Sequence, residues 1–213
     1  MLSMPVQFIS AEEACRLVPD RATVGLIGGG GGLVEASLLH ESMERRFLET
    51  GKPEGLTCIH ALGIGDRESR GMNRFAHEGM VRRVIGGHWV WSPRMQQLAR
   101  ENKIEAYVLP GGVIMQLMRE VAAKRPGLIT HVGLGTFVDP QKDGGRMNEA
   151  CPGYPGGTHH HRWPAIPEIP PSAGGCCPAQ RLHCRRRRKH KPGRRACQPG
   201  HLCNGGRDTQ FRR

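Results

Sequence analysis

The composition of the chain changes abruptly after Ala150, and this change limits which part can fold around a core. Residues 1–150 hold 18 Lys+Arg against 17 Asp+Glu, whereas residues 151–213 hold 13 against 2. The second segment also holds 18 Gly+Pro and six of the eight Cys. Such a composition does not supply enough apolar surface for a core. We therefore expect one folded domain over residues 1–150 and a disordered basic tail over residues 151–213.

Short apolar, β-branched runs alternate with segments of helical periodicity in the first 150 residues. This alternation, with Gly or Pro at the joints, predicts an α/β fold in which helices flank an open, mainly parallel sheet. Ser92 followed by Pro93 is typical of an N-cap and a first helical residue. The expected strands are 22–27, 56–61, 81–85, 104–109 and 128–132, and the expected helices begin at Val34, Pro93 and Val113.

The sequence gives no sign of a membrane or secretory protein. No apolar run approaches the roughly 18 residues of a transmembrane helix, and the N-terminus lacks the basic start and apolar run of a signal peptide. Cys15 and Cys58 are the only cysteines of residues 1–150. Because two isolated thiols fit a reducing compartment, we expect free, buried cysteines and a cytoplasmic protein.

Four glycine-rich turns, at residues 28–32, 86–93, 109–113 and 133–140, are associated with the expected strands. Ligands of open α/β sheets bind beyond the carboxyl ends of the strands, where turns without Cβ atoms let the backbone approach an anion. The same glycines could serve only the geometry of the joints. In the second turn, His88, Trp89 and Trp91 could line a pocket for a flexible ligand, or they could be a packed core Trp and a hydrogen-bonded His.

Familiar catalytic and nucleotide-binding patterns are not met in these turns. The first turn lacks the G-x-G-x-x-G spacing with a later acidic residue, which disfavours dinucleotide binding, and no P-loop is present. No Ser/His/Asp or Cys/His set can be assigned. We expect no metal site, because the histidines of the first 150 residues lack metal-ligand spacing and fit structural roles better. These are His40, His60, His77, His88 and His131.

Residues 5–149 resemble the N-terminal half of the family I coenzyme A transferases, in the acetate/acetoacetyl-CoA and propionate CoA-transferase branch. The resemblance rests on seven phrases in register, which are ISAEEACRLVPDRATVG, GGGGGLVEASLL, GIGDRESRG, HEGMVRRVIGGHW, SPRMQQLARENKIEAY, RPGLITHVGLGTFVDP and GGRMNE. It implies two related α/β halves. It also implies exchange of CoA between an acyl-CoA and a short-chain carboxylate through a glutamyl-CoA thioester.

The resemblance places the nucleophilic Glu in the C-terminal half of the family. No residue here matches its surroundings, so neither Glu35, Glu41 nor Glu78 is assigned that role, and we expect the chain alone to be inactive. Acyl-CoA is then a substrate rather than a permanently bound cofactor, and the intact protein is expected to form a homo-oligomer. The pocket residues implied by position are Gly28, Gly29, Gly30, Gly31, Gly32, His88, Trp89, Gly111, Gly112, Gly135 and Thr136.

Two positions depart from the family pattern. The family usually has Gln where this chain has Gly111, and its amide would face the thioester oxygen. Loss of one such donor typically costs about 10²–10³ in rate. Arg21, where many members have Gly, fits a harmless surface change in a turn.

The tail is compatible with a coding sequence read one base out of phase. The second codon bases of residues 166–171 become first bases that permit YLKYRP, and synonymous codons for residues 183–205 can spell TADEDGNISLEGEPANLDIYAMA. These strings resemble the continuation of the family, and the run Arg185–Arg188 becomes an acidic D-E-D-G. We therefore interpret residues 151–213 as frameshifted, with the shift near codon 150.

Two other interpretations of the tail give it a function of its own. A zinc site could use its His and Cys residues, but no C-x₂-C pair occurs. A nucleic-acid-binding arm could use residues 185–195, since such a basic run binds polyanions without specificity. Few aromatic residues accompany that run, and a charge run by itself is usually solvated.

Overall fold

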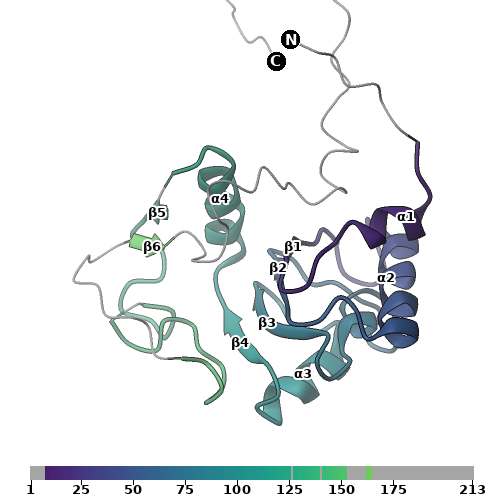
Figure 1. Ribbon diagram of the computed structural model, residues 1–213. Helices are drawn as coiled ribbons and strands as arrows, with labels where there is room; N and C mark the ends of the chain where they lie inside the picture. Colours follow the sequence, from purple (N-terminus) through teal and green to yellow (C-terminus); the bar gives the residue numbers. More distant parts are fainter. Residues whose placement is uncertain (1–7, 126, 140, 153–161, 165–213) are drawn as a thin grey trace, which may run out of the picture.

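The computed structural model describes residues 8–125, 127–139, 141–152 and 162–164 (Figure 1). Its centre is a four-stranded parallel sheet in the order β1-β2-β3-β4, so neighbours in sequence are neighbours in space. The α/β fold with a parallel sheet is therefore confirmed. The strands are β1 (Thr23–Gly25), β2 (Leu56–His60), β3 (Val81–Gly86) and β4 (Glu105–Val108).

Helices cover both faces of this sheet. In Figure 1, α1 and α2 lie side by side on one side of the strands, and α4 lies on the other side. The helices are α1 (Ala11–Arg16), α2 (Ser37–Thr50), the 3₁₀ helix η1 (Gly71–Phe75), α3 (Pro93–Arg100) and α4 (Gly111–Ala122). Among the described residues, none of the helices is long and apolar enough to span a membrane.

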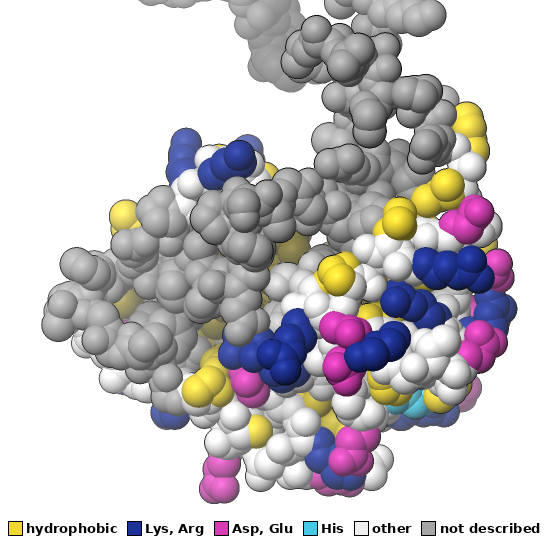
Figure 2. Space-filling view, in the orientation of Figure 1, with side chains coloured by type: hydrophobic (Ala, Val, Ile, Leu, Met, Phe, Trp, Pro, Cys, Tyr) yellow, Lys and Arg dark blue, Asp and Glu magenta, His cyan; other side chains and the backbone are white. Residues whose placement is uncertain are grey.

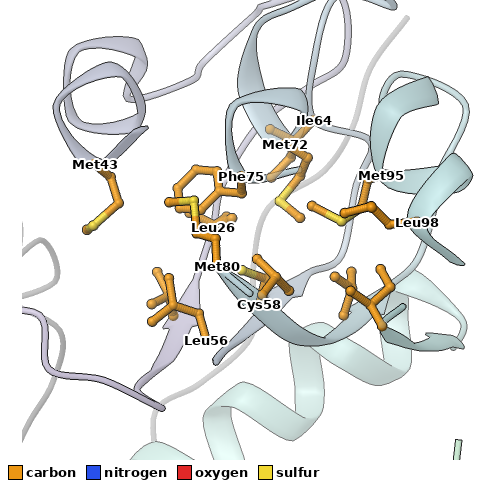
Figure 3. Packing of buried hydrophobic residues seen from close by; sticks show 14 of the residues in the cluster. Leu26, Met43, Leu56, Cys58, Ile64, Met72, Phe75, Met80, Met95 and Leu98 are labelled. Carbon is orange, nitrogen blue, oxygen red and sulfur yellow. The ribbon is translucent and has the colours of Figure 1, made fainter. Parts of the chain in front are cut away.

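Alternate residues of the strands contribute their side chains to two separate hydrophobic clusters. Cys58 and Val84 belong to the larger cluster, with residues of α1, α2, η1 and α3 (Figure 3). Ile59 and Ile85 belong to or pack against the smaller cluster, with residues of α4. Successive strand side chains point to opposite faces, and a hydrophobic cluster covers each face. All five positions of β2 are therefore buried.

Cys15 and Cys58 are buried and form no disulfide bond, as expected. Cys58 lies in the centre of β2, and burial raises the pKa of its thiol to about 12. A thiol that stays protonated at neutral pH is a poor nucleophile, so Cys58 is a core residue.

Several elements differ from the expectations at their ends. Helix α2 begins at Ser37 rather than Val34, because Val34 has a φ of 56°, which the helix cannot contain. Ser92 precedes α3 but makes no capping hydrogen bond with its side chain. Its hydroxyl instead donates to the Trp89 carbonyl oxygen at 3.2 Å.

Helix α1 was not among the expected elements, although its start carries a clear local signal. Ser10 Oγ accepts from the Glu13 N–H at 3.2 Å, and the Glu13 carboxylate accepts from the Ser10 N–H at 2.7 Å. This reciprocal capping box stabilises a helix of only six residues.

The last expected strand does not join the main sheet. Strand β5 (Gly127–Ile129) pairs in antiparallel fashion with β6 (Arg162–Pro164), so the structure places three residues of the expected disordered tail in a strand. The open edge of β4 is covered instead by the segment 145–148, through the Val108 N–H to the Gly145 oxygen at 2.8 Å. The other expectations for the tail, including its zinc and nucleic-acid sites, fall mainly on residues outside the described part.

Asn148 fixes this edge segment to the sheet. Its side-chain amide donates to the carbonyl oxygens of Ala99 at 2.7 Å and Ile104 at 2.8 Å, and its oxygen accepts from Ala106. Cys151 follows it and is buried, with Sγ 3.1 Å from the Ala106 oxygen. Packing thus continues one residue beyond Ala150.

The surface of the α1 and α2 side carries both signs of charge. Figure 2 shows Lys and Arg side chains interspersed there with Asp and Glu. Exposed pairs such as Lys52 with Asp20, at 2.8 Å, are part of this surface. Pairs of this kind contribute little to stability but keep the surface free of a strong single-sign field.

His40 is the titratable residue of α2 that faces the core. It is 3% exposed, and its ring contacts Phe75 edge-on at 5.5 Å. Burial, and then the positive charge of Arg74, lower its pKa to about 4. His40 is therefore neutral in the folded protein at neutral pH, which agrees with the expected structural role.

We predict that His40 makes the protein sensitive to acid. Below pH ~6.5 the unfolded chain binds a proton at His40, whereas the folded chain does so only near pH 4, so the free energy of unfolding falls through this window. The loss from this group reaches about 3 kcal/mol. Urea unfolding between pH 7 and pH 4.5 should show a shallower fall for His40→Leu.

Met43→Ala, in the same helix, is the control for this measurement. It removes a buried side chain without a titrating group, so it should lower stability by a similar amount at every pH. An unchanged pH slope in His40→Leu would contradict the assignment.

Candidate functional site

The carboxyl ends of the four parallel strands bring four chain segments to one edge of the sheet. After β1 comes 26–36, after β2 comes 61–71, after β3 comes 87–92, and after β4 comes the start of α4. Three of them contain glycine turns singled out from the sequence. The segment after β2 contains the phrase GIGDRESRG, for which no separate site was predicted from the sequence. It lies at the same edge of the sheet as the other three.

The glycine run after β1 is an ordered turn. Gly30, Gly31 and Gly32 have φ values of 79°, 61° and 80°, which only glycine adopts readily in succession. The Gly29 N–H donates to the Leu33 oxygen at 2.8 Å, and the Gly32 N–H donates to the Gly65 oxygen at 3.1 Å. The run is thus closed on itself and tied to the segment after β2.

Glu35 makes a second tie between these segments. Its Oε1 accepts from the Gly65 N–H at 2.7 Å, while its Oε2 is buried without a hydrogen-bond partner in the described part of the chain. A Cβ at Gly71 would lie 2.8 Å from that Oε2. The carboxylate is therefore enclosed by the segment after β2, which commits Oε1 to a structural hydrogen bond.

The other two glutamates considered from the sequence also have partners. Glu41 Oε2 lies 3.8 Å from the Arg74 guanidinium, and Glu78 Oε2 accepts from Lys103 Nζ at 2.9 Å. Both carboxylates form ion pairs away from the glycine turns. The structure thus gives no reason to assign either one as the nucleophile.

Asp66 folds the segment after β2 into a compact turn. Its Oδ1 accepts three backbone N–H groups, from Glu68, Ser69 and Arg70, each at 2.9 Å. Burial opposes ionisation of this carboxyl, but these donors outweigh burial and lower its pKa. The negative charge of Asp66 therefore serves the turn itself.

His88 and Trp89 lie at different depths. His88 is exposed, whereas Trp89 is 7% exposed and belongs to the larger core cluster. The indole of Trp89 lies 6.2 Å from the ring of His60, a buried residue whose Nδ1 is 2.8 Å from the Leu62 oxygen. Of the predicted pair, only His88 presents its side chain at the surface of the site.

Gly111 meets the backbone of another segment. A Cβ at Gly111 would lie 2.8 Å from the Ala61 oxygen, and a Cβ at Gly87 would lie 2.1 Å from the same oxygen. Gly112 is exposed, and a Cβ there would meet nothing within 4 Å. The Ala61 carbonyl therefore lies between Gly87 after β3 and Gly111 at the start of α4, in close backbone contact with both.

Gly135 and Thr136 lie in a separate loop. The Gly135 N–H donates to Asp139 Oδ2 at 2.7 Å, and Thr136 Oγ1 donates to the Gly133 oxygen at 2.6 Å. Val138 anchors this loop in the smaller cluster, on the α4 face of the sheet. The structure thus places the two residues on that face, in a loop held by its own polar groups.

Trp91, the second Trp of the glycine turn 86–93, lies where the segments meet. The Arg67 guanidinium stands 4.5 Å above its ring, and its carbonyl oxygen accepts from the Arg67 N–H at 3.0 Å. The glycines of two neighbouring segments pack against its indole. These glycines are far from Trp91 in the sequence, so the contact could not be predicted without the fold.

No metal centre is found in the described part of the chain, where no group of three or more His, Cys, Asp or Glu could hold an ion. The site therefore offers backbone N–H groups, an exposed imidazole and an exposed guanidinium. Such a set can bind and orient an anionic, carbonyl-bearing molecule.

Comparison with known proteins identifies relatives for this part of the chain. A model of the coenzyme A transferase family matches residues 8–165. Acetate CoA-transferase YdiF of Escherichia coli K12 is 44% identical over 144 residues, which are 68% of this chain and 27% of the relative. Caffeate CoA-transferase of Acetobacterium woodii is 46% identical over 144 residues, which are 67% of this chain and 27% of the relative.

Solved structures give the same match. The apoenzyme of the acyl-CoA transferase YdiF from Escherichia coli O157:H7 aligns with a TM-score of 0.65 and 44% identity, over 68% of this chain and 28% of that one. A thioester complex of that protein with CoA aligns with the same TM-score, over 30% of its chain. The chain thus spans about a quarter of the length of its curated relatives.

We predict opposite effects for alanine at two adjacent glycines. Gly111→Ala should lower the free energy of unfolding by about 1–3 kcal/mol, because its Cβ would displace the Ala61 carbonyl. Gly112→Ala should be neutral or stabilising by up to about 1 kcal/mol, since its Cβ has free space in a helix. Urea unfolding of the two variants measures the difference, and equal effects would contradict the contact with Ala61.

Proposed function

The chain belongs to the coenzyme A transferase family, and from this premise we propose that residues 1–150 form the amino-terminal α/β domain of a short-chain acyl-CoA:carboxylate CoA-transferase. The observation that carries the proposal is the meeting of four segments at the carboxyl edge of the sheet. These segments lie within the part of the chain that matches the relatives. Acyl-CoA is the substrate, and no permanently bound cofactor is required.

The proposed reaction exchanges CoA in two half-reactions. A glutamate carboxylate attacks the thioester carbonyl, the C–S bond breaks, and a mixed anhydride and CoA thiolate form. The thiolate then attacks the glutamyl carbonyl, which releases the donor carboxylate and leaves a glutamyl-CoA thioester. An acceptor carboxylate reverses these steps and leaves as the new acyl-CoA.

We assign the nucleophilic glutamate to a part of the family that residues 1–150 do not include. Support comes from the enclosed carboxylate of Glu35 and the ion-paired carboxylates of Glu41 and Glu78. The proposed role of this domain is to bind and orient the acyl end. On this view the chain alone does not transfer CoA, and the frameshift near codon 150 explains the unlike composition of residues 151–213.

Negative charge develops on the thioester oxygen in each half-reaction, and N–H donors lower the barrier where they face it. The run Gly28–Gly32 and the start of α4 are the proposed source of these donors, with His88 at the rim. The Gln usual in the family at position 111 is absent. Because residue 111 is Gly, the amide donor is missing, and we expect a lower rate. The Ala61 oxygen lies where the Cβ of a Gln at this position would be.

The proposed substrates are acetate and related short-chain or 3-keto acids, as in ketone body metabolism. This choice follows the name of the relative YdiF, whereas the second relative is named for caffeate, an aromatic acid. We also propose a cytoplasmic location and a homo-oligomer for the intact protein. Buried free thiols agree with a reducing compartment.

The first test measures binding and turnover of the 213-residue chain. Titration calorimetry should detect binding of acetyl-CoA, and acetate without CoA should bind more weakly because it offers fewer contacts. Transfer of CoA from acetoacetyl-CoA to acetate should stay at the rate of buffer. Turnover by the chain alone would contradict the assignment of the nucleophile to another part.

A chimera tests the domain in a complete enzyme. Residues 8–150 replace the matching segment of Escherichia coli YdiF, with YdiF itself as the reference. The chimera should transfer CoA between acetyl-CoA and a short-chain carboxylate, about 10²-fold more slowly than YdiF for want of one donor. A folded chimera that binds acetyl-CoA but transfers nothing would overturn the proposed function.

A further inference from the structure

Trp91 packs on glycine backbone rather than on the hydrophobic core. Among the described residues it belongs to neither core cluster, in contrast to Trp89 two positions earlier. A Cβ at Gly30 would lie 2.6 Å from Trp91 Nε1, and a Cβ at Gly63 would lie 2.3 Å from its Cδ1. Both glycines therefore leave the space that one indole fills.

The backbone of Trp91 is held as firmly as its ring. Its carbonyl oxygen accepts from the Arg67 N–H at 3.0 Å and from Asn73 Nδ2 at 3.1 Å, and it would lie 2.3 Å from a Cβ at Gly65. The Arg67 guanidinium covers the outer face of the ring at 4.5 Å. Contacts with Arg67 and Asn73 thus hold Trp91 in place independently of the glycine run.

We propose that Trp91 is a positioning residue that sets the shape of the glycine run 28–32, and through it the place of the acyl-CoA thioester. The Gly32 N–H donates to the Gly65 oxygen, and this hydrogen bond links the end of the run to the segment after β2. The indole lies against Gly30 and Gly31 of the run and against Gly63 of that segment, so it limits how far the run can move toward the segment. The second half of this inference rests on the proposed function.

Two positions of the glycine run separate the contact with Trp91 from backbone strain. Gly30 and Gly32 have φ values of 79° and 80°, so alanine is equally strained at both. A Cβ at Gly30 would clash with the indole, whereas a Cβ at Gly32 would meet nothing within 4 Å. Any excess effect of Gly30→Ala over Gly32→Ala therefore measures the clash with Trp91.

Amide hydrogen exchange of the full chain reads out the shape of the run. Gly30→Ala should raise exchange in residues 28–33 about tenfold or more above Gly32→Ala. In the Trp91→Ala background this excess should disappear. Trp91→Ala alone should raise exchange in residues 28–33 and 63–67 about tenfold, with a small change in the urea midpoint, and Trp91→Phe should restore most of the protection.

Three results would overturn the positioning role. One is equal exchange in Gly30→Ala and Gly32→Ala with Trp91 present, a comparison that does not depend on whether Trp91→Ala folds. Another is an excess that persists in the Trp91→Ala background. The last is unchanged exchange in Trp91→Ala, or an increase spread evenly over all segments, because a core residue would act on the whole domain.

Acetyl-CoA binding tests the functional half separately. Affinity should fall about tenfold in Trp91→Ala and recover in Trp91→Phe, in parallel with exchange in residues 28–33. Loosened exchange with unchanged affinity would overturn the link between Trp91 and the thioester. If the wild-type chain does not bind acetyl-CoA, the proposed function fails, while the exchange data still decide whether Trp91 shapes the run.

Discussion

The burial of β2 on both faces is the constraint on which the rest of the domain depends. Its five residues are all buried, with Cys58 in one hydrophobic cluster and Ile59 in the other. A strand buried in this way needs a parallel neighbour on each side and a helix layer on each face. Since the strands are then parallel, their carboxyl ends share one edge, and the glycine segments meet there. The position of the site is therefore a consequence of the core.

Close contacts at this edge, with one carbonyl group and one indole, explain several of its glycines. The Ala61 oxygen lies where Cβ atoms of Gly87 and Gly111 would be, and the Trp91 indole lies where those of Gly30 and Gly63 would be. Close approach brings N–H groups of different segments near one another without long side chains between them. Closely packed backbone segments hold their N–H dipoles in fixed directions. Fixed dipoles stabilise developing negative charge better than mobile side chains do.

The strands of the sheet could be predicted because continuous apolar, β-branched runs are typical of strands buried on both faces. The glycine turns could be predicted because they follow such runs in the sequence. Local geometry was harder. Val34 looked like the first residue of a helix, but it takes a left-handed conformation that sequence does not reveal. The capping box of Ser10 and Glu13 was visible in the sequence and was overlooked because the helix is short. Trp91 stood out as part of a glycine turn, but its packing partners could not be predicted, since they lie about 30 and 60 residues away and only the sheet brings them together.

The described residues thus supply shape rather than reacting groups. The carboxylates of Glu35 and Asp66 near the site are committed to hydrogen bonds with the backbone, whereas His88 and Arg67 are exposed. Burial lowers the pKa of His60, which keeps that imidazole neutral beside Trp89. Under the proposed function, the described residues contribute binding geometry at the carboxyl edge of the sheet. The shape of the glycine run is then the quantity on which that contribution depends, because a small misplacement of oriented N–H groups lowers the rate steeply.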